Sequence, residues 1–321
     1  MAQPTSPIPA TMRAAVLTGL GGPELLRPAD LPVPVPGAGE VLIRVHAAGV
    51  NAIDWATRIG QGVGIGVFPA VLGWDLSGTV AALGPGATRF AVGDQVFGMP
   101  RFPRLAGAYA QYAVAPEGEL AQLPAGLEHN AAAGAPMVTL TAWESLVDHA
   151  QLTSGQRVLV SGAAGGVGHV AVQLAKALGA EVIGTASAAN HEFLRELGAD
   201  QVVDYGSGRV ADAVKDVDVV LDPRGGADFA ELAQVLRPGG IIVTLKGQQA
   251  GYQELLAARG VRGGYTYVSP NGAALGEIAT LLGDGSLRIA VERVFPLAQA
   301  AEAHRTGERG HVRGRLILDT E

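Results

Sequence analysis

Short runs of alternating apolar and polar residues fill the first 136 positions and predict strands rather than helices. The runs are rich in β-branched side chains, and clusters of Pro and Gly separate them. The expected strands cover residues 13–17, 40–49, 77–83, 94–98 and 109–115, and one helix is expected near 52–59. Many short strands at close spacing are typical of an antiparallel, barrel-like domain.

The pattern changes after residue 131, where a helix is expected at 139–150, and apolar strands then alternate with helical segments. The expected strands are 157–161, 181–185, 201–203, 217–221, 241–245 and 264–268, and the expected helices are 166–178, 190–197, 227–236 and 252–258. This alternation is typical of a doubly wound parallel sheet, the Rossmann arrangement. A further helix at 273–282 and strands near residue 293 and at 315–318 follow Pro270.

The two patterns predict an α/β chain with two domains, in agreement with a length of 321 residues. The Rossmann cofactor domain would cover 137–269. The β-rich domain would be discontinuous and join 1–136 to 270–321.

Composition narrows the function classes. The net charge is −7, which disfavours binding to nucleic acid or to an anionic membrane. The chain has no cysteine, which excludes disulfides, thiolate catalysis and cysteine-based zinc sites. No apolar stretch is long enough to span a bilayer, and the first residues do not read as a secretory signal, so a cytoplasmic location is expected.

A glycine-rich segment connects the first strand of the alternation to its first helix, which is the context of a dinucleotide-binding turn. Gly165 would let the backbone approach a pyrophosphate, and Gly168 would let the helix pack closely on the strand. The helix N-terminus would offer N–H groups to the phosphates. The alternative is a turn that binds nothing. The expected cofactor-binding residues are Gly162, Ala163, Ala164, Gly165, Gly166, Val167 and Gly168.

The stretch that follows the second strand of this alternation favours NADP over NAD. An NAD site usually has an acidic residue about 20 positions after the glycines, but residues 184–187 contain none. Ser187, His191 and Tyr205 could donate hydrogen bonds to a 2′-phosphate. Each also has a plain structural reading: Ser187 as a helix N-cap, His191 as a solvated helix residue and Tyr205 as a half-buried loop residue.

Several motifs together resemble one known family. The β-rich part contains Gly-Val-Asn at 49–51, Gly-Trp-Asp-Leu-Ser-Gly at 73–78 and Gly-Asp-Gln-Val-Phe at 93–97, and Thr-Ala-Trp at 141–143 precedes the glycine-rich turn. With the ending Gly-His-Val-Arg-Gly-Arg-Leu-Ile-Leu at 310–318, the set resembles the medium-chain dehydrogenase/reductase superfamily. Within it, the chain is similar to the zinc-independent, NADPH-dependent quinone oxidoreductases, the zeta-crystallin-like branch. The resemblance implies that the β-rich domain is GroES-like.

The resemblance also implies that no zinc is bound. Asn51 stands where zinc alcohol dehydrogenases carry a cysteine, and Trp74 and Asp75 stand where they carry His and Glu. Asp75 is expected to pair with an arginine near the C-terminus, Arg313 or Arg315. Asp54 and Arg58 are expected to form a surface pair four residues apart on their helix.

Reduction of a quinone or an α,β-unsaturated carbonyl is the activity that the resemblance implies, with NADPH supplying the hydride. Asn51 would donate a hydrogen bond to the acceptor carbonyl, and Thr141 would contact the nicotinamide end of the cofactor. The same end would be approached by Leu245, Lys246, Gly247, Val268 and Ser269. An apolar substrate wall could be built from Trp55, Phe68, Trp74 and Tyr267, although each could equally be a core residue.

Two other functions stay open: a dedicated enoyl reductase of a biosynthetic pathway, and a non-catalytic NADPH-binding protein of the crystallin or sensor type. A short-chain dehydrogenase is excluded because no tyrosine has a lysine four residues later. A homodimer is also expected, because the strand at 264–268 would be an exposed sheet edge that can pair with its copy.

Overall fold

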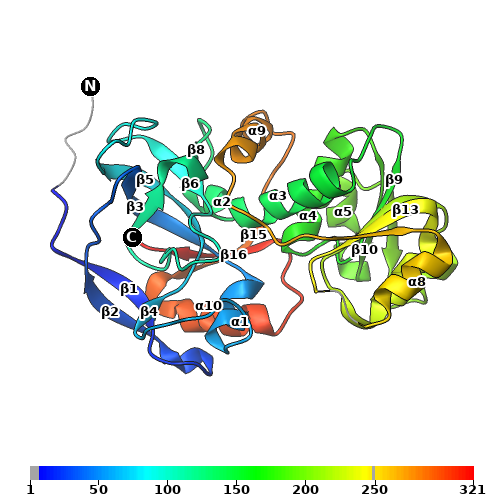
Figure 1. Cartoon of the computed structure of the whole chain (residues 1–321), viewed down its shortest axis with the longest axis horizontal. Coiled ribbons are helices and arrows are strands. Elements are labelled where there is room, and N and C mark those ends of the chain that lie inside the picture. The colour runs from blue at the N-terminus through cyan, green and yellow to red at the C-terminus, as the bar shows by residue number, and fades with distance from the viewer. Residues whose placement is uncertain (1–6, 248–249) are drawn as a thin grey trace. The chain divides into compact units, whose positions relative to one another are not determined.

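The computed structural model describes residues 7–247 and 250–321, which form two compact units (Figure 1). The first unit joins Met1–Met137 to Ser269–Glu321, and the second unit is Val138–Val268. The expected domain boundaries, after residues 136 and 269, each differ from these by one residue. The expected fold class, a Rossmann domain combined with a GroES-like domain, is confirmed.

The second unit is built on a parallel sheet of six strands in the order β11-β10-β9-β12-β13-β14. This is the doubly wound order 3-2-1-4-5-6, in which the connections reverse direction between β9 and β12. The strands are β9 (Arg157–Val160), β10 (Glu181–Ala186), β11 (Gln201–Asp204), β12 (Val217–Asp222), β13 (Leu236–Thr244) and β14 (Arg262–Tyr265). Ligands bind such sheets at the carboxyl ends of the strands beside the reversal.

Helices connect these strands. They are α4 (Gly166–Ala177), α5 (His191–Glu196), α6 (Val210–Ala213), α7 (Phe229–Leu232) and α8 (Tyr252–Arg259). Right-handed connections place α4 and α5 on one face of the sheet and α7 and α8 on the other. Apolar side chains from both layers form the core, among them Ile183, Val220 and Phe229.

The structure differs from the expected elements at several places in this unit. Helix α6 was not expected, and β14 begins and ends earlier than the expected strand at 264–268. The helix expected at 227–236 is short, because Leu236 pairs with Val217 and already belongs to β13. The helix expected at 139–150 is α3 (Pro136–Trp143), which begins in the first unit and continues as a π-helical segment, Glu144–His149.

The first unit contains two sheets. The larger one has the order β15-β16-β3-β5-β6-β8, with β7 also paired to β3, and the smaller one is β2-β1-β4. The strands are β1 (Thr11–Leu17), β2 (Leu26–Pro32), β3 (Glu40–Val50), β4 (Ala70–Val71), β5 (Asp75–Leu83), β6 (Gln95–Gly98), β7 (Tyr112–Pro116), β8 (Leu120–Gln122), β15 (Val291–Pro296) and β16 (Arg315–Asp319). The helices are α1 (Ala52–Arg58), α2 (His129–Ala133), α9 (Gly272–Gly283) and α10 (Ala300–Glu308).

Strand β2 and helix α10 are among the elements of the first unit that were not predicted. Strand β2 contains Pro28 and Pro32, which an edge strand tolerates, and within residues 7–247 and 250–321 its one partner strand is β1. Helix α10 is polar on average, and its buried residues, Ala300, Ala303, His304 and Gly307, are small or polar, so its buried face is not marked by large apolar side chains. This helix packs beside α1 and determines the surroundings of the candidate site.

Strand β3 and helix α1 position the site in the first unit. Val41, Ile43 and Val45 alternate into the core along β3, and the strand ends at Val50. Asn51 therefore follows directly on a well-anchored strand. Within residues 7–247 and 250–321, no helix is both long and apolar enough to cross a membrane.

Candidate active site

Asn51 lies at the N-terminal end of α1 and is 4% exposed. Its backbone N–H donates to Asp54 Oδ2 at 2.6 Å, and its side-chain Nδ2 donates to Asp75 Oδ2 at 2.9 Å. Asn51 and Asp54 form the capping box of the helix. Since an amide nitrogen has two hydrogens, the bond to Asp75 orients the group and leaves a second N–H for another acceptor.

Asp75 connects three segments of the first unit. Its Oδ2 also accepts a hydrogen bond from an Arg315 Nη at 2.9 Å, and its Oδ1 accepts the backbone N–H of Met137 at 2.8 Å. Both side chains of the ion pair are buried, at 0% and 5% exposure. The predicted pairing of Asp75 is confirmed, with Arg315 rather than Arg313 as the partner. Burial raises the pKa of Asp75 to about 6, against the opposing effects of Arg315, Asn51 and Met137.

The expected surface pair between Asp54 and Arg58 is wrong. Both residues are buried, because the face of α1 that carries them packs against α10, a helix that the sequence did not reveal. Asp54 instead holds the Asn51 N–H, and Arg58 pairs with Glu308 and donates to the carbonyl of Gly21.

Burial raises the pKa of Asp54 to about 7. The Asn51 N–H and the Tyr109 hydroxyl oppose this rise as hydrogen-bond donors, while the charge of Asp75 adds to it and that of Arg315 opposes it. The carboxyl that fixes the start of α1 therefore changes its charge near neutral pH.

His304 of α10 continues this buried polar chain. The Arg58 Nε donates to His304 Nδ1 at 3.3 Å, and His304 Nε2 lies 3.3 Å from the Tyr109 hydroxyl. Burial and the Arg58 charge lower the pKa of His304 to about 3, so the ring is neutral at physiological pH. A neutral ring that accepts at Nδ1 carries its hydrogen on Nε2. The ring therefore donates toward the Tyr109 hydroxyl. That hydroxyl in turn forms a hydrogen bond with the Asp54 carboxyl.

The four aromatic residues predicted to line a substrate wall lie in different environments. Trp74 is fully buried, and its indole N–H donates to the carbonyl of Arg104 at 2.7 Å. Trp55 packs on α10, where a Cβ added to Gly307 would lie 2.6 Å from its ring. The alternative role as a core residue fits the burial of Trp74, whereas Trp55 is half-buried against the core. Phe68 and Tyr267 are 37% and 52% exposed.

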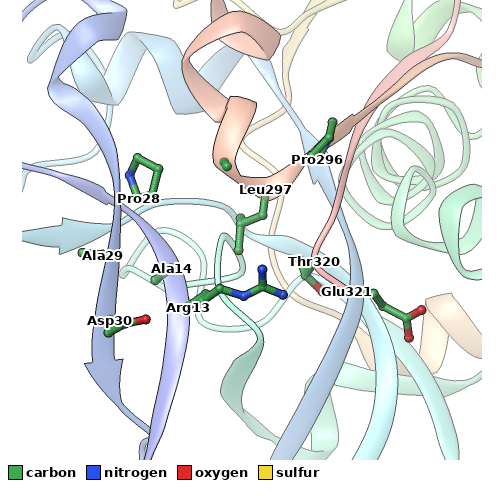
Figure 2. A pocket seen from close by; sticks show the side chains of 10 residues that line it. Arg13, Ala14, Pro28, Ala29, Asp30, Pro296, Leu297, Thr320 and Glu321 are labelled. Carbon is green, nitrogen blue, oxygen red and sulfur yellow. The ribbon is translucent and has the colours of Figure 1, made fainter.

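The first unit also has a cavity of about 250 Å³ that none of the predicted site residues lines. Figure 2 shows Arg13 of β1 extending toward the wall formed by Thr320 and Glu321, with Asp30 of β2 and Leu297 among the other lining residues. Its lining includes one basic residue, two acidic residues and several prolines and alanines. This mixture does not indicate a particular ligand.

In the second unit, the glycine-rich turn has the geometry of a phosphate-binding loop. Gly165 is the N-cap of α4, and Gly162 has a φ of +61°. A Cβ added to Gly168 would lie 2.7 Å from the Cα of Ala163, so only glycine lets the helix start this close to the strand. The Ala163 N–H donates to the carbonyl of Thr185 on β10 at 2.9 Å, which fixes the turn. The backbone thus fits a bound pyrophosphate.

The three residues predicted to face a 2′-phosphate are Ser187, His191 and Tyr205. Ser187 precedes the 3₁₀ segment Ala188–Asn190 but makes no capping bond, and its Oγ accepts a hydrogen bond from Asn190 Nδ2 at 3.2 Å. His191 Nε2 is buried and has no hydrogen-bond partner within the described part of the chain. Tyr205 is 41% exposed.

The remaining predicted cofactor residues lie in segments that follow β13 and β14, or on α3. Lys246 follows β13, with its N–H bonded to Thr244 Oγ1 at 3.1 Å and its side chain against Gly225. Thr141 is 6% exposed on α3. The division between the units falls between Val268 and Ser269. The turn, Lys246 and the loop after β12 thus gather at the carboxyl edge of the sheet, beside its reversal point.

Sequence reasoning missed several residues of these sites. Arg224 lies at the reversal point, and its place two residues after the end of an apolar strand was the available signal. Tyr109, His304 and Glu308 offered no such signal, because each meets its partner across a long separation in sequence. Across residues 7–247 and 250–321, no three His, Cys, Asp or Glu side chains lie together in a way that could hold a metal ion.

Comparisons with known proteins agree with this architecture. The alcohol dehydrogenase GroES-like domain matches residues 37–125, and the zinc-binding dehydrogenase family matches residues 197–318. The mitochondrial NAD(P)H oxidoreductase RTN4IP1 of Danio rerio is 33% identical over 96% of this chain and 91% of its own length. Human quinone oxidoreductase is 30% identical over 96% and 97%. The solved quinone oxidoreductase of Coxiella burnetii is 35% identical, with a TM-score of 0.91 over 97% of this chain and 100% of its own.

The chain therefore belongs to the medium-chain dehydrogenase/reductase superfamily, among the quinone oxidoreductases that resemble zeta-crystallin. This family supports an oxidoreductase that uses a nicotinamide cofactor.

Proposed function

We propose that this chain reduces a quinone or an α,β-unsaturated carbonyl by hydride transfer from NADPH, without a metal ion. The observation that carries the proposal is the arrangement of Asn51, Asp75 and Arg315. Both oxygens of Asp75 accept N–H groups, and one of these belongs to the Asn51 side chain. Asp75 therefore serves to orient an uncharged hydrogen-bond donor.

When bound, NADPH supplies the hydride. A carbonyl oxygen gains negative charge as a hydride reaches the conjugated system, and a donor fixed beforehand stabilises that charge. Asn51 meets this requirement because Asp75 holds one of its N–H groups and the other remains available. The reduced oxygens of a quinone exchange protons with water, so this acceptor needs no dedicated acid from the protein.

Preference for NADPH over NADH rests on the residues after β10. An acid at the position of Ser187 would repel a 2′-phosphate, and the chain has none between Gly184 and Ser187. The glycine-rich turn and the start of α4 fit the pyrophosphate that both cofactors share.

The test is an assay of NADPH oxidation with quinones and enones, and of alcohol oxidation with NADP. Asn51→Ala should lower kcat by about 10²–10³, as for the loss of one donor to a developing oxyanion. Asn271→Ala is a matched control, because Asn271 also starts a helix of the first unit, α9, and accepts N–H bonds from Ala273 and Ala274. The activity of Asn271→Ala should stay at the wild-type level.

Three results would contradict the proposal. Loss of activity with a chelator and recovery with zinc would overturn the metal-free mechanism. NADPH binding without turnover of any quinone or enone would favour the crystallin or sensor alternative. Activity confined to enones, with none on quinones, would favour a dedicated enoyl reductase.

We also propose a homodimer joined at β14. Among the described residues, this strand pairs with β13 alone and ends the sheet, so its outer edge can pair with a second copy. Light scattering at micromolar concentration should give twice the chain mass of 32.7 kDa. A monomeric mass would refute the pairing.

A further inference from the structure

We propose that Arg224 is the cationic specificity residue for the 2′-phosphate of NADPH. The proposal rests on the NADPH preference proposed above and assigns it to a side chain outside the set predicted from the sequence.

Arg224 lies where a doubly wound sheet binds its ligand. It follows β12, whose neighbour β9 leads into the glycine-rich turn, and the connections reverse between these two strands. The Asp222 carboxylate accepts the backbone N–H groups of Arg224 at 3.1 Å and of Gly225 at 3.0 Å. Asp222 is fully buried, so the backbone of this loop is anchored in the core.

The Arg224 side chain extends from the glycine-rich turn toward the end of β11. A Cβ added to Gly162 would lie 3.3 Å from Arg224 Cδ, so the aliphatic part of the arginine lies against the first glycine of the turn. At the other end, the guanidinium carbon lies 5.6 Å from the centre of the Tyr205 ring. Arg224 thus joins the turn expected to hold the pyrophosphate to a tyrosine expected to face the 2′-phosphate.

The charge of Arg224 is only weakly engaged within the protein. Its ion pair with Asp228 spans 3.8 Å, and both side chains are 53% exposed. Exposed pairs of this kind contribute little and exchange readily. A phosphate binds a guanidinium through two parallel hydrogen bonds, so a 2′-phosphate can replace Asp228 as its partner.

The same geometry explains how this chain can favour NADPH, because Arg224 adds a positive charge to the neutral hydrogen-bond donors. Ser187 and Tyr205 offer only neutral donors, and a doubly charged phosphate needs a cation as well. Lys246 also lies at this edge of the sheet, but its side chain is packed against Gly225, next to the loop backbone. Arg224 is the cation in contact with Tyr205.

The test is calorimetric binding of NADPH and NADH to the full-length wild type and to Arg224→Met, which removes the charge and keeps much of the side-chain length. The NADPH dissociation constant should rise about 10- to 100-fold, the effect of losing hydrogen bonds between charged groups. The NADH constant should change less than about 2-fold. Arg224→Lys should lie between the two, because lysine keeps the charge but not the paired donors.

Arg209→Met is the matched control. Arg209 belongs to the same unit, is 56% exposed and has a comparable ion pair, with Glu231 at 3.9 Å. Its NADPH affinity should equal that of the wild type. Adenosine 2′,5′-bisphosphate and adenosine 5′-monophosphate differ only by the 2′-phosphate. Titrating both in the same way therefore measures the contribution of this phosphate to binding without the nicotinamide half of the cofactor.

The outcomes separate this proposal from the proposed function. A wild type that binds both cofactors equally would refute the NADPH preference itself. A wild type that prefers NADPH, together with Arg224→Met that keeps this preference, would refute the role of Arg224 alone. Equal weakening of NADPH and NADH in Arg224→Met would place the side chain on a part common to both cofactors and would also overturn the proposal.

Discussion

Removing the positive charge from the buried ion pair of the first unit should destabilise the protein strongly at alkaline pH. In Arg315→Met, Asp75 loses the partner that lies 2.9 Å away, while Asp75 itself stays at 0% exposure. Breaking a buried ion pair by removing one partner costs about 3–5 kcal/mol, because the remaining charge is left without compensation. For a domain of this size, that corresponds to a fall in Tm of about 6–20 °C.

The loss should depend on pH in a defined direction. Burial raises the pKa of Asp75 to about 6 in the folded state, from 3.8 in the unfolded chain, and Arg315 opposes this rise. Without Arg315 the pKa of Asp75 rises further. At pH 8 Asp75 of the wild type is charged, so Arg315→Met loses the full contribution of the ion pair to the free energy of unfolding. At pH 5 Asp75 already carries a proton in the folded wild type, so the same substitution lowers the free energy of unfolding little.

Urea unfolding followed by circular dichroism at pH 5 and pH 8 measures both effects. Arg305→Met is the control, because Arg305 has an exposed pair with Glu302 at 3.3 Å in the same unit and should lose less than about 1 kcal/mol. Adding Asp75→Asn to Arg315→Met should restore part of the stability, since no buried charge then remains. A loss equal to that of the control, or equal losses at the two pH values, would refute this reasoning.

Three further predictions follow from the sites. Ser187→Asp should shift cofactor preference toward NADH by charge repulsion with the 2′-phosphate, and unchanged affinities for both cofactors by calorimetry would contradict it. Gly168→Ala should abolish NADPH binding, because its Cβ would lie 2.7 Å from the Ala163 Cα, and retained binding in a titration would show that the turn can adjust. His304→Gln should flatten the loss of stability on acidification in urea unfolding: the pKa of His304 falls to about 3 when the chain folds, so its contribution is complete above pH 6.5 and is lost as the pH falls toward 3. An unchanged slope between pH 4.5 and 6.5 would count against that assignment.

The sequence predicted those parts of the fold that local patterns determine. The glycine-rich turn is an example, because the strand, the glycines and the helix follow one another within a few residues. Strand β2 was missed because its prolines are unfavourable everywhere except at an edge, and edges are defined only by the assembled sheet.

Only part of the candidate site could be predicted from the sequence. Asn51 and the pairing of Asp75 came from the family resemblance. The burial of Asp54 and Arg58 could not be predicted, because it depends on α10, whose His304 meets Arg58 across 246 residues of sequence. The role proposed for Arg224 likewise depends on which strands become neighbours at the reversal point.

The hydrogen bonds of Asp75 also set the order in which the protein can mature during synthesis. The second unit is one continuous segment, Val138–Val268, and it can fold as soon as it leaves the ribosome. Asn51 emerges much earlier, but Asp75 lies 240 residues before Arg315, so the ion pair must wait for the last strand to be translated. The second unit can thus be complete while Asn51, the proposed donor, still lacks its final support, and a ribosome stalled before β16 would carry a folded second unit beside an unfinished first unit.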